Sequence, residues 1–169
     1  MYKERVLVSG AKQAELTMER IAWQLLESYS GQELPVFLGI GERGFSVAVM
    51  LANETGKLSG QSLQVYRLPG WRNQPDDLTY PKFDPESWRA RKVLLVDDVL
   101  YTGKTMYYAL QFVMQTDPAQ VKSMVWVDRG HRCFPLAADF VGIQLATVLQ
   151  DFVEVKISLT ENQIETFLR

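Results

Sequence analysis

The amino-acid sequence predicts an α/β fold in which an open, parallel β-sheet is flanked by helices on both faces. Residues 36–38 and 93–96 are uninterrupted apolar runs, and residues 121–127 are mainly apolar, as is typical of strands buried in a parallel sheet. Apolar residues at helical spacing occupy segments before and between these runs. With 169 residues, the chain suits one domain, residues 1–169, with a sizeable core.

The N-terminal part predicts a short strand and then a long helix. Val6-Leu7-Val8 is a strand or extended arm, and Ser9-Gly10 leads into the helix. From Ala11 to Tyr29, apolar residues recur on one side of a helix, which is predicted to stop near Gly31. The apolar stripe consists of Ala14, Met18, Ile21, Ala22, Leu25, Leu26 and Tyr29.

A glycine-rich turn follows the strand at residues 36–38 and leads into a helix that extends to about Thr55. Gly39-Ile40-Gly41-Glu42-Arg43-Gly44 satisfies the dinucleotide pattern Gly-x-Gly-x-x-Gly, with a strand before it and a helix after it. However, the next predicted strand, residues 63–68, offers no carboxylate for an adenosine ribose, and Arg67 suggests at most a 2′-phosphate. A plain tight turn is a further interpretation.

Residues 69–87 show no periodicity and include four prolines. A loop of this length inside a compact domain is usually functional or mobile.

The most informative stretch is residues 93–105. The aliphatic strand is followed by Asp97-Asp98, by a turn of small and hydroxylic residues, and by a helical pattern from Met106 to Met114. The amides of residues 102–105 would be unpaired donors at a helix N-terminus, which favours a phosphate. The two carboxylates are acceptors that suit a vicinal diol. Together these groups indicate a ribose 5′-phosphate site at the carboxyl end of a strand.

Three alternatives were weighed for this stretch. A Walker A loop is rejected, because it would require glycine five residues before Gly103, where the chain has Asp98. Asp98 could merely cap a turn after a buried strand. An acidic pocket for magnesium, as in receiver domains, would leave the hydroxyl-rich turn without a use.

The C-terminal third predicts further strands. Asp128 follows the strand at residues 121–127, which places Asp128, Arg129 and His131 at the same sheet edge as Asp97. Residues 140–147 and 152–157 are predicted strands that form a hairpin or an edge addition. Residues 160–169 show a weak helical stripe with Thr160 at its start.

Composition excludes several classes of function. A net charge of −2 and a pI near 5.5 give no general attraction to nucleic acid. The single Cys133 excludes an internal disulfide, and one cysteine with one histidine cannot form a structural zinc site. Without a signal sequence or long apolar span, we expect a cytoplasmic protein with no membrane association.

Two sequence blocks resemble a known family. Val96-Asp97-Asp98-Val99-Leu100-Tyr101-Thr102-Gly103-Lys104-Thr105 resembles the phosphoribosyl pyrophosphate signature of type I phosphoribosyltransferases. Within that superfamily it is most similar to the pyrimidine-operon attenuators that double as uracil phosphoribosyltransferases. Residues 127–132 and 135–142 resemble the same family.

The resemblance implies the type I phosphoribosyltransferase fold, with a small hood and a flexible loop at about residues 69–87. It implies transfer of ribose 5-phosphate from phosphoribosyl pyrophosphate to a nucleobase, most plausibly uracil, with Mg²⁺ held largely by the substrate and by no complete protein site. The resemblance implies catalysis by Asp97 and Asp98, and ribose 5-phosphate binding by Tyr101, Thr102, Gly103, Lys104 and Thr105. It implies pyrophosphate binding by Gly41, Glu42, Arg43 and Gly44, and places Tyr66 and Arg67 in the flexible loop. The implied base pocket consists of Asp128, Arg129, His131 and Arg132.

The chain departs from the family pattern at two places. Tyr66-Arg67 is followed by Leu68-Pro69 where the family has Asp-Asp-Leu, and Ala146-Thr147-Val148 stands where the family has Pro-Thr-Ser. Two other functions therefore remain open: an RNA-binding attenuator and a nucleotide-binding module without turnover. The first helix has a weak basic footprint for RNA, since Lys12 and Arg20 stand among three glutamates. The apolar C-terminal strands favour a homodimer or a higher homo-oligomer.

Overall fold

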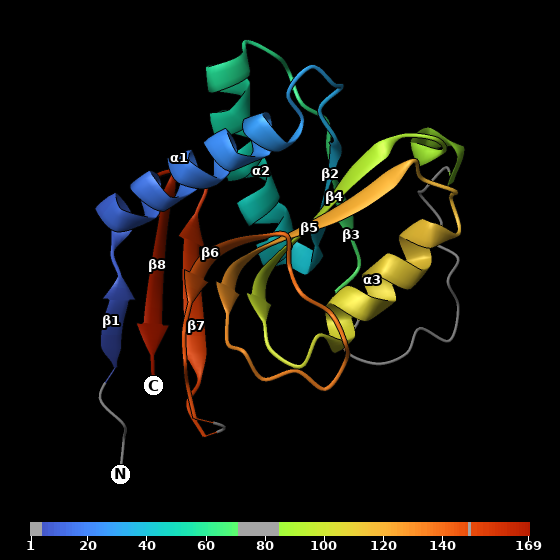
Figure 1. Cartoon of the computed structure of the whole chain (residues 1–169). Coiled ribbons are helices and arrows are strands. Elements are labelled where there is room, and N and C mark those ends of the chain that lie inside the picture. Colours follow the sequence, from blue (N-terminus) through green and yellow to red (C-terminus); the bar gives the residue numbers. More distant parts are fainter. Residues whose placement is uncertain (1–4, 71–84, 149) are drawn as a thin grey trace.

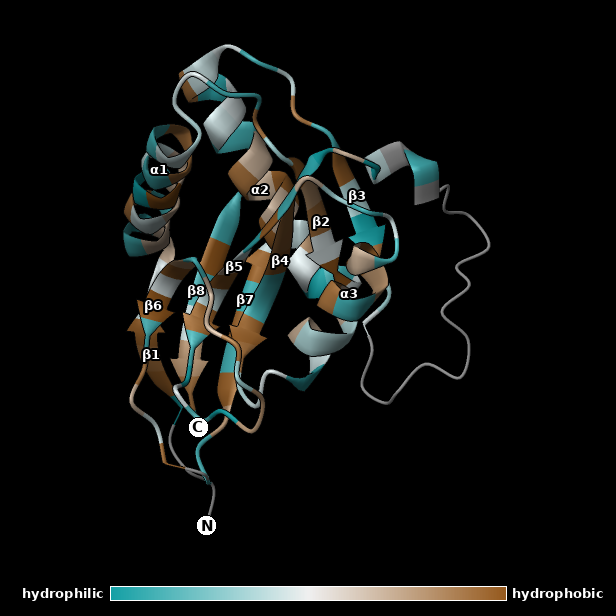
Figure 2. Cartoon of the chain, turned by 45° about the vertical axis from the view of Figure 1, so that its right-hand side comes forward, coloured by the Kyte–Doolittle hydropathy of each residue, from teal (hydrophilic) through white to brown (hydrophobic). Residues whose placement is uncertain are grey.

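The computed structural model describes residues 5–70, 85–148 and 150–169, and its centre is a five-stranded parallel sheet with strand order β3-β2-β4-β5-β6 (Figure 1). β4 is the central strand and pairs with β2 and β5. The strands carry long apolar stretches (Figure 2), because both faces of the sheet are covered. Their bounds are β2 (Val36–Ile40), β3 (Val65–Leu68), β4 (Lys92–Leu100), β5 (Gln120–Asp128) and β6 (Phe140–Gln144).

Helices cover both faces of this sheet, as predicted. α1 (Ala11–Ser28) and α2 (Gly41–Ser59) share one apolar core with inward residues such as Phe37 and Leu94. α3 (Lys104–Met114) forms a second core on the other face with Leu38, Leu95 and Trp88, the last residue of the short 3-10 helix Pro85–Trp88. The two cores are separate because successive side chains along each strand point to opposite faces of the sheet.

A second sheet of three antiparallel strands lies beside the first, in the order β1-β8-β7. β1 (Val6–Ser9) and β7 (Val153–Ser158) both pair with β8 (Gln163–Leu168). Figure 1 shows this sheet under α1, with β1 and β8 side by side. It forms the small hood expected from the resemblance, and β8 holds the N-terminal strand in place.

One expectation for the C-terminal third is wrong, and another is correct in only one of its two alternatives. Residues 163–168 form β8 rather than a helix, because Ile164 and Thr166 are buried in alternation along an extended strand. The predicted strands at 140–147 and 152–157 do not form a hairpin: β6 pairs in parallel with β5, whereas β7 belongs to the hood. The alternative of an edge addition is correct for β6.

α2 begins at Gly41, four residues earlier than predicted, and its close contacts with β4 and β2 explain two of the glycines. A Cβ on Gly44 would lie 2.7 Å from the Val96 carbonyl oxygen, and a Cβ on Gly39 would lie 2.2 Å from the Phe45 Cα. Both positions therefore allow α2 to approach the sheet closely. Residues 71–84 of the predicted flexible loop lie outside the described residues. In the described part, no helix combines the length and apolarity needed to cross a membrane.

Candidate functional site

An open cleft of about 570 Å³ lies at the carboxyl ends of β2 and β4. This is the edge at which open α/β sheets bind ligands. The first turn of α2 and the acid pair of β4 line the cleft, together with Thr105 at the start of α3 and Phe152 next to the hood. The contributing residues are Ile40, Gly41, Glu42, Arg43, Gly70, Asp97, Asp98, Val99, Thr105 and Phe152.

The two acids of the cleft differ in environment. β4 continues through both of them to Leu100, beyond the strand end expected from the sequence. Asp97 is 7% exposed, and its Oδ1 accepts a hydrogen bond of 2.9 Å from the Asp98 amide. Burial, followed by the charge of Asp98, raises the pKa of Asp97 well above the usual range. Asp98 is half-buried, with Oδ2 3.7 Å from Nη1 of Arg43.

The first turn of α2 forms one wall of the cleft and is suited to an anion. Ile40 precedes the helix and supplies no side-chain cap, so the dipole and amides of the turn face the cleft. Gly41 has a φ of 64°, which favours glycine. Glu42 places a carboxylate in this turn, and its Oε2 lies 2.5 Å from Nη1 of Arg67 on β3.

The predicted phosphate turn, residues 101–105, leads from the end of β4 into the N-terminus of α3. Gly103 precedes α3 with a φ of 87°, and the Thr102 carbonyl accepts hydrogen bonds from the amides of Cys133 and Phe134. The Lys104 amide donates to Thr102 Oγ1 at 3.3 Å. The Tyr107 amide is the first in α3 to bond back to a carbonyl, that of Gly103. The amides of Thr105 and Met106 therefore point outward from the helix N-terminus.

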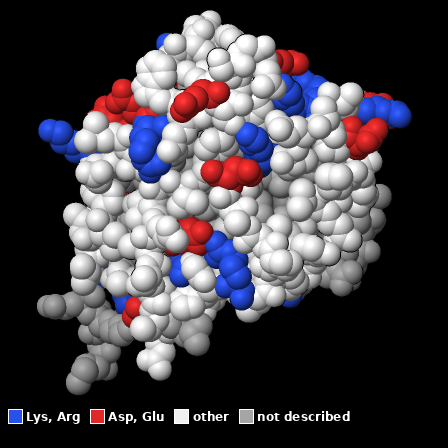
Figure 3. Space-filling model, in the orientation of Figure 1, with Lys and Arg blue, Asp and Glu red and all other residues white. Residues whose placement is uncertain are grey.

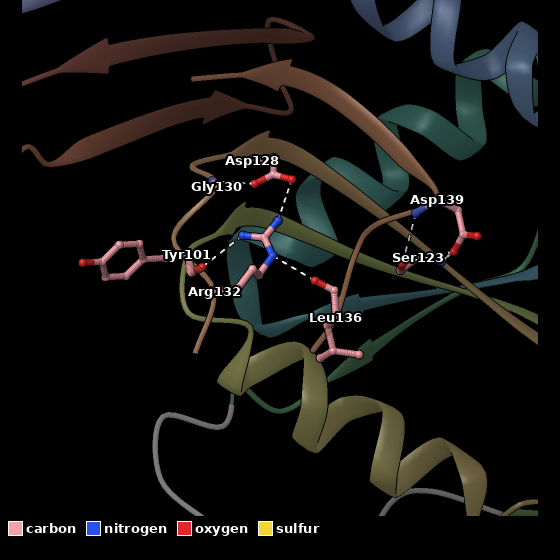
Figure 4. A network of polar contacts seen from close by, with 7 residues as sticks. All are labelled: Tyr101, Ser123, Asp128, Gly130, Arg132, Leu136 and Asp139. Carbon is pink, nitrogen blue, oxygen red and sulfur yellow. Dashed lines mark hydrogen bonds and ion pairs between the residues drawn. The ribbon is translucent and has the colours of Figure 1, made fainter. Parts of the chain in front are cut away.

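Arg132, in the loop after β5, braces this turn rather than pointing freely into the cleft (Figure 4). Its guanidinium donates to Asp128 Oδ2 at 2.5 Å, to the Tyr101 carbonyl at 3.1 Å and to the Leu136 carbonyl at 2.9 Å. Asp128 also accepts from the Gly130 amide. Asp128 and Arg132 thus connect the end of β5 to the phosphate turn.

The other two predicted base-pocket residues hold the segment that leads from β6 to the hood. Arg129 is 7% exposed, stacks 4.2 Å from the Tyr101 ring centroid and donates to Thr147 Oγ1 and to the carbonyls of Val148 and Asp151. His131 Nε2 lies 2.5 Å from the Thr147 carbonyl oxygen. These contacts fix Thr147, Val148 and Asp151 and, with them, the position of Phe152.

The two residues predicted for the flexible loop lie at the margin of the cleft, and one residue that lines the cleft was not predicted from the sequence. Arg67 reaches the cleft only through Glu42, and Tyr66 contacts Trp88 on the α3 side. Phe152 was not predicted: it is 57% exposed and lines the cleft, and its backbone pairs with Arg169 of the hood. An aromatic residue just before a strand was its only signal in the sequence.

Comparison with known protein families matches the part of the chain that forms the cleft. The model of the phosphoribosyl transferase domain family matches residues 10–155, which is most of the chain and includes the whole acid pair and phosphate turn. The chain belongs to the phosphoribosyltransferase family. The resemblance inferred from the two sequence blocks is thereby confirmed.

Curated phosphoribosyltransferase relatives match over nearly the full length. "Bifunctional protein PyrR" of Bacillus cereus (strain B4264) is 33% identical over 172 aligned residues, covering 95% of each chain, and the protein of the same name from Bacillus anthracis (strain CDC 684 / NRRL 3495) matches equally. Among solved structures, the hypoxanthine phosphoribosyltransferase of Trypanosoma cruzi superposes with a TM-score of 0.75 at 16% identity, covering 95% of this chain and 94% of the other. The HGPRT-ase of Leishmania tarentolae gives 0.74 at 18% identity and covers 98% of both chains. These structures establish the phosphoribosyltransferase fold.

Proposed function

We propose that the protein transfers ribose 5-phosphate from phosphoribosyl pyrophosphate to a nucleobase, with uracil as the first candidate, and releases pyrophosphate. One observation carries the proposal: a single cleft joins an acid pair to the N-termini of two helices. The pair suits a ribose diol, and each helix N-terminus suits one of the two phosphate-bearing ends of the donor. Uracil is supported by the resemblance to attenuators with that activity.

In this reaction the bond between ribose C1′ and the pyrophosphate oxygen breaks, and a bond from C1′ to a ring nitrogen forms. Positive charge develops on the ribose ring, as in glycoside hydrolysis. Asp98, which faces Arg43 and the cleft, supplies a negative charge near that ring. Buried Asp97 orients the Asp98 backbone and contributes a polar contact to the diol. Phe152 offers a flat apolar surface to the base.

We further propose Mg²⁺ as the cation that accompanies the donor. Among the described residues, no group of three or more His, Cys, Asp or Glu side chains is placed to bind a metal. Asp98 still fits the ion, because Mg²⁺ combines one carboxylate with water and substrate oxygens. Bound in this way, Mg²⁺ would neutralise charge on the pyrophosphate. Arg43 at the first turn of α2 adds a donor for the same group.

The test is a pyrophosphate-release assay with phosphoribosyl pyrophosphate, Mg²⁺ and a panel of free bases, including uracil, hypoxanthine and guanine. We expect release that depends on one base, and uracil is expected to give the highest kcat/KM. Tight binding of ribose 5-phosphate without release by any base would instead support a nucleotide-binding module without turnover. We place the reaction in the cytoplasm, as the single cysteine suggests.

RNA-binding attenuation is the second candidate, favoured by the 33% identity to proteins named bifunctional. The face in Figure 3 shows acidic and basic side chains interspersed, without a continuous basic patch. In addition, Arg20 on α1 donates to the carbonyls of Val141 and Gly142. Filter binding to the chain's own operon leader over a salt titration separates the candidates: retention that falls steeply with salt supports attenuation, and no retention removes it.

A further inference from the structure

A cavity of about 160 Å³ lies between α3, the strands β4 and β5, and the loop that leads from β5 to β6. It shares no lining residue with the cleft. α3 connects β4 to β5, whereas residues 129–139 connect β5 to β6 as a loop. This loop presents the small side chains of Ala137 and Ala138, so the space beside α3 is left unfilled.

The wall of this cavity is mainly aliphatic. Its apolar side chains come from both strands, the helix and the loop, namely Leu95, Leu100, Met106, Leu110, Val121 and Leu136. Lys122 also lines the cavity, but its ammonium group donates to Ser28 Oγ on α1, which covers the opposite face of the sheet. Of the described lining residues, the other polar ones are Ser123 and Asp139, and they bond to each other (Figure 4). Asp139 Oδ2 accepts from the Ser123 amide at 2.8 Å and from Ser123 Oγ at 3.2 Å.

The size and chemistry of the wall select a neutral, apolar occupant. A buried water molecule needs about two to four polar partners, and aliphatic side chains supply none. Apolar cavities of about 150 Å³ in proteins stay free of water and bind benzene. A molecule with one ring or two fused rings, such as benzene or indole, therefore fits this cavity, whereas burying a charge against aliphatic side chains is costly.

The loop over the cavity is held at both ends, so the cavity exists before anything binds. Near β5, the amides of Cys133 and Phe134 donate to the Thr102 carbonyl of the phosphate turn. Near β6, Asp139 is bonded to Ser123. An occupant therefore does not have to order the loop, which favours its affinity.

The wall of the cavity is also continuous with the phosphate turn. Leu100 is the last residue of β4 and Met106 lies in the first turn of α3, so residues 101–105 connect these two wall residues. Leu136 lies beside the turn as well, since a Cβ on Gly103 would be 3.8 Å from the Leu136 Cβ. An occupant that restrains Leu100, Met106 and Leu136 therefore restrains the turn.

We propose that a neutral, apolar molecule with one ring or two fused rings binds in this cavity and strengthens the binding of ribose 5-phosphate at the turn. With the turn already restrained, less conformational freedom is lost when the phosphate binds. The coupling is reciprocal, so ribose 5-phosphate strengthens the binding of the occupant by the same factor. The site rests on the cavity alone, whereas its effect rests on the proposed function, through the phosphate turn.

Crystals of the full chain soaked with iodobenzene test the site, because the anomalous scattering of iodine marks the position of the molecule. Titration calorimetry with indole, without sugar phosphate, should give a dissociation constant of about 1 mM or below. Ala138→Leu fills the cavity from the loop and Leu110→Phe narrows it from α3, and each is expected to weaken indole binding at least about fivefold. Ala119→Leu makes the first of these changes at an exposed position before β5 and should leave indole binding unchanged. Circular dichroism checks that each variant is folded.

The coupling is measured by titrating ribose 5-phosphate into the full chain with and without saturating indole. Indole is expected to lower the dissociation constant of ribose 5-phosphate at least about twofold. The proposal is overturned if no iodine lies in the cavity, if neither filling variant weakens indole binding, or if indole leaves the affinity for ribose 5-phosphate unchanged. Failure of ribose 5-phosphate to bind even without indole would contradict the proposed function instead, and the iodine position would still decide the site.

Discussion

Asp97 and Asp98 are neighbours in the sequence, but the structure gives them different chemistry. Asp97 is buried and its pKa is raised, so it tends to hold a proton, whereas Asp98 faces the cleft beside Arg43. The sequence predicted the pair as two equivalent acceptors. Strand alternation separates them, because consecutive residues of β4 point to opposite faces. Asp98 is therefore the residue of the pair that faces Arg43 in the cleft of the proposed reaction.

Asp98→Asn is expected to lower kcat/KM for phosphoribosyl transfer at least tenfold, a loss of about 1.4 kcal/mol or more in transition-state stabilisation. The cause is the loss of negative charge near the positively charged ribose. Steady-state kinetics with the preferred base provides the measurement, and Glu54→Gln, about three turns along α2 from Arg43, is the control. A variant of near-normal rate would refute the role given to Asp98.

Asp97→Asn is expected to raise the melting temperature at pH 8, and the gain should shrink as the pH falls toward 4. Because the folded protein binds a proton at Asp97 more tightly than the unfolded chain, this group stabilises the fold below the usual aspartate pKa. That stability is lost as the pH rises through the raised pKa. An amide avoids the loss and can still accept the Asp98 hydrogen bond. Thermal melts across this range would contradict the account if the difference were constant or reversed.

Glu42 is an unusual residue for an anion site, since it adds negative charge to the first turn of α2. Glu42→Gln is expected to lower KM for phosphoribosyl pyrophosphate about two- to fivefold with little change in kcat, because Arg67 is released from its ion pair. Glu54→Gln, which breaks the Glu54–Lys57 pair farther along the same helix, is the matched control. An unchanged or higher KM would show that Glu42 does not oppose the donor.

At the scale of elements, the glycine pattern around residues 39–44 led to the wrong start for helix α2. Glycine has low helix propensity, so Gly41 and Gly44 suggested a loop. In the structure, residues 41–44 are the first turn of α2, and the close approach to β4 explains the glycine at position 44. Tertiary packing outweighs local propensity here.

Gly44→Ala is expected to lower the free energy of unfolding by about 1–3 kcal/mol, because the new Cβ would meet backbone atoms of β4 that cannot move aside. The displaced helix should also raise KM for the donor. Gly10→Ala is a suitable control, since its Cβ would lie 3.7 Å from the Leu7 Cδ2 and should cost less than about 1 kcal/mol. Urea denaturation compares the two; equal effects would contradict the close-packing explanation.

The last element shows where local patterns are insufficient. Residues 160–169 carry a weak helical stripe, yet β8 forms because β1 and β7 both pair with it. β1 comes from the opposite end of the chain, so no local window contains this partner. Edge and hood strands depend on such long-range pairing more than buried central strands do.

At the scale of the whole molecule, the sequence predicted the parallel sheet, its two helical layers and the strand edge that holds the acid pair, because buried strands and helices leave strong periodic signals. The family resemblance implied a hood, but local patterns did not predict that β1, β7 and β8 form its sheet, nor that Phe152 lies next to the hood in the cleft. Nor did the sequence show that Arg129 and Arg132 brace neighbouring segments, since the same residue types serve binding and support equally well.

The most direct test is a crystal structure of the protein soaked with ribose 5-phosphate. We predict the phosphate at the N-terminus of α3, within hydrogen-bond distance of the Thr105 and Met106 amides, and the ribose hydroxyls directed at Asp97 and Asp98. Sugar phosphate bound elsewhere, or a cleft that stays empty at saturating concentration, would contradict the central claim.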